Sequence, residues 1–246
     1  MEKFVDKRSY ETSHEKDWVK LRTEHLESLD SLSVADSPML YMDRRLFAQT
    51  VAKIKLFEMS KNVQGSIVEC GVHRGNSLML FMHLCSVFSP MSFNKKIIGF
   101  DTFEGFADIS PLDPPGINPG DMGDVDYELL SNWVEIQQKN NTIPHIPRIE
   151  LVRGLAEETI PSYLEENPHL LVSFLYMDFD LYAPTILALK HIFPLMPKGS
   201  VIAFDQLNQK KWRGETFAIK EFFSINNLKL QVFDFEPHIS YAVVGE

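Results

Sequence analysis

Short apolar runs alternate with longer amphipathic stretches from residue 66 to residue 224. The apolar runs cover residues 66–70, 96–101, 149–153, 172–178 and 200–205. Segments with helical spacing of apolar residues lie between and after them, at 76–88, 155–166, 183–195 and 214–224. Strands that alternate with helices are typical of βαβ units, in which the strands are parallel. The pattern therefore predicts an α/β fold.

Two further apolar runs, 229–235 and 239–244, are separated by only a few residues around Pro237. A link this short cannot hold a crossover helix, so these two runs should pair as an antiparallel hairpin. The chain is therefore expected to form a Rossmann-like sheet of seven strands. Most of its strands should be parallel, its last strand antiparallel, and both of its faces covered by helices.

Three segments lie outside this alternation. Residues 37–63 have apolar residues at helical spacing and should form a helical cover before the first strand, whereas residues 1–36 read as a polar arm. Residues 106–126 contain four prolines, three glycines and five aspartates. A loop of this length in a compact domain is usually either functional or disordered, and we interpret it as a lid. One α/β domain is then expected to cover residues 37–246.

Composition and charge narrow the class of protein. The net charge of −10 and the absence of a long basic run argue against a nucleic-acid partner. No apolar run is long enough to span a bilayer, and two cysteines in apolar surroundings do not form a disulfide framework. These features predict a cytoplasmic protein without a membrane partner.

Four of the predicted strands end in an acid: Glu69, Asp101, Asp178 and Asp205. The carboxyl ends of parallel strands share one edge of the sheet, where open α/β sheets bind their ligands. The alternative is that each acid merely caps the helix that follows. Four acids in register at one edge favour a binding site.

The turn that follows Glu69 carries Gly71 and Gly75, which let the backbone approach a ligand closely. The chain has no P-loop, and Glu69 would repel a phosphate but attract an ammonium. Asp101 suits the two hydroxyls of a ribose. An ammonium, a ribose and no phosphate together describe S-adenosylmethionine. A nicotinamide-dependent oxidoreductase is the alternative, although the third glycine of its fingerprint is missing.

Four stretches carry a resemblance to a known family: "IVECGVHRGNSLML", "GFDTFEGF", "LYMDFDLYAPT" and "VIAFDQLN". Together they resemble the macrocin O-methyltransferase-like family of sugar O-methyltransferases, which are metal-dependent class I enzymes that use S-adenosylmethionine. The resemblance covers residues 37–246. It implies that Glu69, Gly71 and Ser77 hold the methionine part of the cofactor and that Asp101 holds its ribose. It also implies that the adenine lies beside Gly154 and Leu155.

The same resemblance implies a metal site and a base. Asp178 and Asp205 would be metal ligands, and Asp180 would be the general base. Independently of the resemblance, His238 is a minor alternative base, because it begins the last predicted strand on the same edge. The family usually has two adjacent acids after the fifth strand, whereas this chain has Asp205 and Gln206. The carbonyl oxygen of Gln206 can still bind Mg²⁺, but the site loses a negative charge. A non-catalytic cofactor-binding protein with a decayed metal site is therefore a further alternative.

The expected acceptor is the hydroxyl of a small molecule, such as a glycoside or a nucleotide sugar. Lys210, Lys211 and Arg213 follow the fifth strand and could meet a substrate phosphate, although a solvated basic loop would show the same sequence. A homo-oligomer is left open by the sequence.

Overall fold

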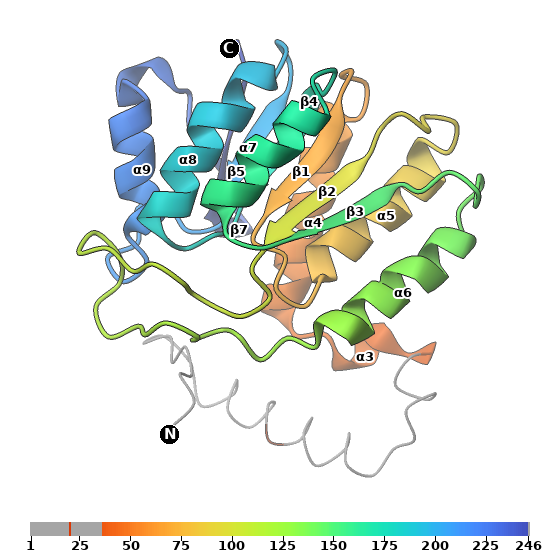
Figure 1. Ribbon diagram of the computed structural model, residues 1–246, viewed down its shortest axis with the longest axis horizontal. Coiled ribbons are helices and arrows are strands. Elements are labelled where there is room, and N and C mark those ends of the chain that lie inside the picture. Colours follow the sequence, from red (N-terminus) through yellow and green to blue (C-terminus); the bar gives the residue numbers. More distant parts are fainter. Residues whose placement is uncertain (1–19, 21–35, 246) are drawn as a thin grey trace. The chain divides into compact units, whose positions relative to one another are not determined.

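The structure is a computed structural model that describes residue 20 and residues 36–245 (Figure 1). Contacts divide the chain into two compact units, residues 1–48 and 49–246. In the first unit, the described residues form α3 (Pro38–Tyr41) and the start of α4 (Arg44–Ser60). The expected polar arm, 1–36, lies outside the described residues except for Lys20 and Asp36.

The second unit holds one sheet of seven strands. The strands are β1 (Ser66–Cys70), β2 (Ile97–Asp101), β3 (Ile149–Arg153), β4 (Val172–Met177), β5 (Val201–Phe204), β6 (Gln231–Phe233) and β7 (Glu236–Val243). Their order is β3-β2-β1-β4-β5-β7-β6. The first five strands are parallel, and β7 pairs antiparallel with both β5 and β6. The predicted mostly parallel sheet with an antiparallel last strand is confirmed.

Helices cover both faces of the sheet (Figure 1). They are α5 (Asn76–Phe88), α6 (Tyr127–Lys139), α7 (Ala156–Glu166), α8 (Tyr182–Ile192) and α9 (Gly214–Phe222), with 3-10 turns at Phe193–Leu195 and Ile225–Asn227. Side chains of α4, α5 and α6 form one apolar core with the sheet, and side chains of α7, α8 and α9 form the other. Alternation along β1 serves both cores, because Ile67 belongs to the first and Val68 to the second.

Three details differ from the sequence prediction. The segment 37–63 is not one helix, because the backbone at Met42 is extended between α3 and α4. Helix α6 had not been assigned, although Asp126 caps it by accepting a hydrogen bond from the Leu129 amide. The turn between the last two strands lies at residues 234–235, and Pro237 is the second residue of β7.

In the part of the chain that the structure describes, every helix is too short or too polar to cross a bilayer.

Candidate active site

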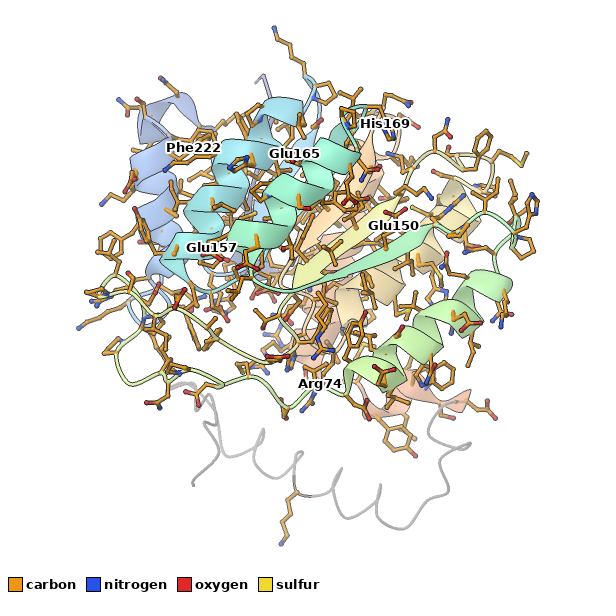
Figure 2. All side chains as sticks on the ribbon, viewed as in Figure 1. Arg74, Glu150, Glu157, Glu165, His169 and Phe222 are labelled. Carbon is orange, nitrogen blue, oxygen red and sulfur yellow. The ribbon has the colours of Figure 1, made fainter. Side chains whose placement is uncertain are left out.

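The four strand-end acids lie along one edge of the sheet. Glu69 is the last residue but one of β1, and Asp101 is the last residue of β2. Asp178 and Asp205 directly follow β4 and β5. Since these strands are parallel neighbours, their carboxyl ends meet at the lower edge in Figure 1. Arg74, in the turn after β1, lies at this edge in Figure 2, whereas His169 lies at the opposite end of the sheet. The predicted grouping of the acids is confirmed by the topology.

The turn after β1 requires glycine at two positions. Gly71 has a φ of 97°, and a Cβ atom there would lie 2.0 Å from the backbone oxygen of Asp178. Gly75 has a φ of 79°, caps α5, and would place a Cβ atom 2.5 Å from the Leu130 side chain. The backbone of this turn therefore packs directly against the loop that follows β4.

Gly71→Ala is expected to destabilise the protein strongly, because the new methyl group meets a backbone oxygen and the φ value disfavours alanine. Gly116→Ala is the matched control, since Gly116 has a φ of 85° but no atom within 4 Å of its Cβ position. The free energy of unfolding of the control should fall by only about 1 kcal/mol, because alanine is disfavoured at a positive φ. Urea unfolding of the two variants measures the difference. Equal losses would contradict the close approach at Gly71.

Asp101 holds this turn in place. One carboxylate oxygen accepts hydrogen bonds from the amides of Val72 and His73, both at 2.8 Å, and the other accepts from the amide of Phe103 at 2.7 Å. A carboxylate has about four acceptor positions, so one remains for a ligand hydroxyl. The sequence had suggested only a ligand contact for Asp101, whereas in the structure its carboxylate also fixes the backbone of the turn after β1.

A buried polar cluster lies on the α4/α5 side of β1. The Lys53 ammonium donates to the Ser77 hydroxyl at 2.5 Å, and Ser77 hydrogen-bonds Glu69. Burial raises the pKa of Glu69 to about 8, and the neighbouring Lys53 charge opposes this rise. Oε2 of Glu69 is buried and has no hydrogen-bond partner. An unsatisfied buried acceptor at the ligand-binding edge fits a ligand that carries a cationic donor.

Asp178 and Asp205 form an acidic pair at the adjoining strand ends. Burial raises the pKa of Asp178 well above its usual value, and the charges of Asp205 and Asp180 raise it further. Oδ1 of Asp205 accepts a hydrogen bond from the Tyr176 hydroxyl at 2.7 Å. Tyr176 is itself fully buried, and the Lys53 ammonium lies 4.6 Å from the centre of its ring. The repulsion between buried carboxylates is relieved when a cation lies beside them.

Gln206 lies beside this pair. The backbone amide of Gln206 donates to the Glu215 carboxylate at 3.3 Å. The side-chain oxygen Oε1 of Gln206 is buried without a partner. Among the described residues, no group of three or more His, Cys, Asp or Glu side chains is placed to hold a metal ion. Asp178, Asp205 and Gln206 offer two carboxylates and one amide oxygen at this edge, which are the kinds of oxygen ligand that a hard cation prefers.

Asp180 is held in an unusual backbone conformation. Its φ is 63°, a value that favours glycine, asparagine and aspartate, and only 9% of its surface is exposed. Its backbone hydrogen-bonds Glu215, a buried acid at the start of α9. The preceding residue, Gly214, would place a Cβ atom 2.6 Å from the Asp180 backbone oxygen. The start of α9 thus fixes Asp180, a contribution that the sequence analysis missed.

The remaining predicted residues lie at the two ends of the same edge. Gly154 has a φ of 139° and its amide donates to the backbone oxygen of Asp101, while Leu155 is the N-cap of α7. His238, on β7, lies 3.2 Å from the Gln209 side chain in the loop after β5. The edge therefore runs from Leu155 beside β3 to His238 beside β5.

The loop between β2 and α6 passes along this edge toward the starts of α8 and α9 (Figure 1). Asp113, which is buried, accepts a hydrogen bond from the Tyr182 amide at 2.6 Å and so caps α8. The Arg213 guanidinium donates to three backbone oxygens of the loop, those of Pro111, Leu112 and Asp113. Arg213 therefore fastens the loop, a role that differs from both sequence interpretations, the phosphate contact and the solvated basic loop.

The comparisons with known proteins agree with this geometry. The family model described as macrocin-O-methyltransferase (TylF) matches residues 27–241. A search of curated proteins found no match. The crystal structure of CalS11, described as a calicheamicin methyltransferase, has a TM-score of 0.91 and 29% identity, covering 96% of this chain and 95% of that one.

Two further structures are similar. The apo structure of CalS11, described as a TDP-rhamnose 3'-O-methyltransferase of calicheamicin biosynthesis, has a TM-score of 0.83 and 27% identity, covering 99% of this chain and 100% of that one. The O-methyltransferase NovP has a TM-score of 0.60 and 17% identity, covering 80% of this chain and 79% of that one, and supports the fold alone.

The family match spans much more than half of the chain, and it decides against the nicotinamide oxidoreductase. The strand-end acids and the glycine turn, on which the resemblance was based, lie inside the matched region. The chain belongs to the macrocin O-methyltransferase family and is an S-adenosylmethionine-dependent O-methyltransferase.

Proposed function

We propose that this enzyme methylates a hydroxyl of a sugar, carried by a glycoside or a nucleotide sugar, with the help of a divalent ion such as Mg²⁺. The observation that carries the proposal is that the acidic pair, Asp178 and Asp205, lies at the same sheet edge as Glu69. The similarity to CalS11, which is described as acting on TDP-rhamnose, supports a sugar as the acceptor.

The cofactor would lie over the ends of β1, β2 and β3. Oε2 of Glu69 would accept from the ammonium of the methionine part, and Ser77 would lie beside the same part. The turn at Gly71 and Gly75 would let the backbone approach the cofactor. Asp101 would accept one ribose hydroxyl at its open position, and Gly154 and Leu155 would border the adenine.

The pKa of Glu69 makes cofactor binding depend on pH. A ligand ammonium stabilises the carboxylate form, so binding releases a proton wherever the free enzyme holds Glu69 protonated, which is below about pH 8. We expect the affinity for S-adenosylhomocysteine to rise between about pH 6 and pH 7.5, by at most roughly tenfold per pH unit. Calorimetry in buffers of different ionisation enthalpy counts the released proton.

Glu69→Gln is the control for this prediction, because glutamine cannot titrate. The variant should bind S-adenosylhomocysteine more weakly and release no proton. Proton release that persists in Glu69→Gln would assign the titration to another group.

The ion would be held by Asp178, Asp205 and the side-chain oxygen of Gln206. When bound, a divalent ion lowers the pKa of a hydroxyl that it contacts. Asp180 would accept the hydroxyl proton as the general base, with His238 as the second candidate. The remaining requirement is in-line alignment of the hydroxyl with the methyl group, which a rigid edge can provide.

We also propose that the loop 106–126 covers the acceptor as a lid or wall. Asp113 and Arg213 hold its middle against α8 and α9, next to Asp180. We place the reaction in the cytoplasm, and a homo-oligomer stays open.

The test is a mass-spectrometric screen of the purified enzyme with S-adenosylmethionine and a panel of nucleotide sugars, glycosides and catechols. We expect one added methyl group on a sugar substrate, and loss of the product after chelation. Methylation of catechols alone would overturn the sugar assignment. Methylation of a sugar that survives exhaustive chelation would overturn the role of the ion.

A further inference from the structure

Lys53 is a buried cation that the proposed mechanism does not use. It lies on α4, with 8% of its surface exposed, and its ammonium donates to the Ser77 hydroxyl at 2.5 Å. An ammonium has three donor hydrogens, and burying it is unfavourable unless it meets a partner of opposite charge. None of the described ion pairs includes Lys53, although its charge opposes the rise that burial causes in the pKa values of the nearby Glu69 and Asp178 carboxyl groups.

The neighbours of Lys53 place it at the start of α5. Ser77 is the second residue of that helix, and the N-cap, Gly75, has no side chain to satisfy the first amides. Backbone amides at the start of a helix favour an anion. Lys53 and the start of α5 therefore present positive charge to the same space.

Glu69 lies on the other side of Ser77 and presents negative charge there once a ligand ammonium stabilises its carboxylate form. Ser77 bonds both Lys53 and Glu69, and Oε2 of Glu69 has no protein partner. A cation and an anion separated by one hydroxyl match a ligand that carries a carboxylate and an ammonium on one carbon atom. The amino-acid half of S-adenosylmethionine is such a group.

We infer that Lys53 receives the carboxylate of the cofactor's amino-acid half, so that Lys53 and Glu69 together recognise its zwitterion. The inference rests on the proposed cofactor site and adds a residue to it. Lys53 is held for this task by the Tyr176 ring, whose centre lies 4.6 Å from the ammonium.

The test compares two ligands that differ in the amino-acid half. S-adenosylhomocysteine has the carboxylate and the ammonium, whereas 5'-methylthioadenosine has neither. Lys53→Met should weaken S-adenosylhomocysteine by roughly 10–100-fold, the worth of a hydrogen bond to a charged group, and leave 5'-methylthioadenosine unchanged. Lys53→Arg, which keeps the charge, should recover most of the lost affinity. Isothermal titration calorimetry measures the six affinities, for the wild type and the two variants with each ligand.

Lys95→Met is the matched control. Lys95 is also a buried lysine with 8% exposure, but its ammonium donates to the backbone oxygens of Val63 and Gly65 and to Ser173. Its loss should lower the stability of the protein and leave the ratio of the two affinities unchanged.

A third measurement needs no variant, in case Lys53→Met does not fold. The wild type should bind decarboxylated S-adenosylmethionine roughly 10–100-fold more weakly than S-adenosylmethionine. Equal affinities would overturn the inference, as would a Lys53→Met variant that weakens both test ligands equally. If the wild type bound neither 5'-methylthioadenosine nor S-adenosylhomocysteine, the proposed cofactor site itself would be overturned.

Discussion

Asp180→Asn is expected to lower turnover by roughly 10²–10⁴-fold, the usual contribution of a general base. The substitution removes the proposed proton acceptor, together with a negative charge that adds to the rise that burial causes in the pKa values of Asp178 and Glu215. Asparagine tolerates the φ of 63° that Asp180 adopts, and the backbone bond to Glu215 does not depend on the side chain. The affinity for S-adenosylhomocysteine should stay at the wild-type value. Steady-state kinetics with a saturating acceptor measure the effect.

Asp126→Asn is the matched control for the loss of one carboxylate. Asp126 caps α6 through the Leu129 amide, and asparagine caps helices equally well. The control should turn over normally. Normal turnover of Asp180→Asn would reassign the base, and the same experiment with His238→Gln would follow.

Asp178→Ala is expected to lower activity by roughly 10²-fold or more, because the proposed ion loses a ligand and the acceptor hydroxyl keeps its high pKa. The affinity for S-adenosylhomocysteine should change little, because Gly71 approaches the backbone oxygen of Asp178 and not its side chain. In the presence of a chelator, the melting temperature of the variant should be no lower than that of the wild type. The reason is that the wild-type carboxylate is buried and repelled by Asp205.

Glu165→Ala provides the comparison for Asp178→Ala. Glu165 is an exposed acid on α7, at the opposite end of the sheet in Figure 2. It should leave both activity and Mg²⁺ dependence unchanged. An Asp178→Ala variant with wild-type activity, or wild-type activity that a chelator does not reduce, would contradict the metal site.

The sheet could be predicted because its strands are buried on both faces and read as apolar runs. The helix starts at Asn76 and Gly214 were also placed correctly, since a change of period marks them. Helix α6 is hard to predict even though Tyr127, Leu130 and Val134 have helical spacing. The reason is that large apolar residues, Leu129, Trp133 and Ile136, also lie on its exposed face and blur the apolar stripe. The last turn was misplaced because Pro237 was read as a turn residue. Proline is tolerated near the start of a strand, where a missing amide costs little.

The acids of the site could be located because each ends a strand, and topology alone brings parallel strand ends together. Lys53, Glu215 and Asp113 could not be located in this way. They come from a helix before the sheet, the start of a late helix and a loop, and only packing brings them to the edge. A weak signal existed for Lys53, which lies three residues before Leu56 and four before Phe57, on the buried face of α4.

The fastening of the loop 106–126 has a consequence for how this enzyme could acquire new acceptors. Its middle is tied down by Asp113 and Arg213, while Gly116 and Gly120 have open space where a side chain would stand. Insertions at such a tip cost little stability, and a side chain at either glycine costs only the backbone strain of a positive φ, about 1 kcal/mol. The sheet edge to which we assign the cofactor and the base is built from other segments. Under the proposed roles, the residues that choose the acceptor and those that transfer the methyl group lie in separate segments of the chain, so that the first can diversify while the second stays fixed.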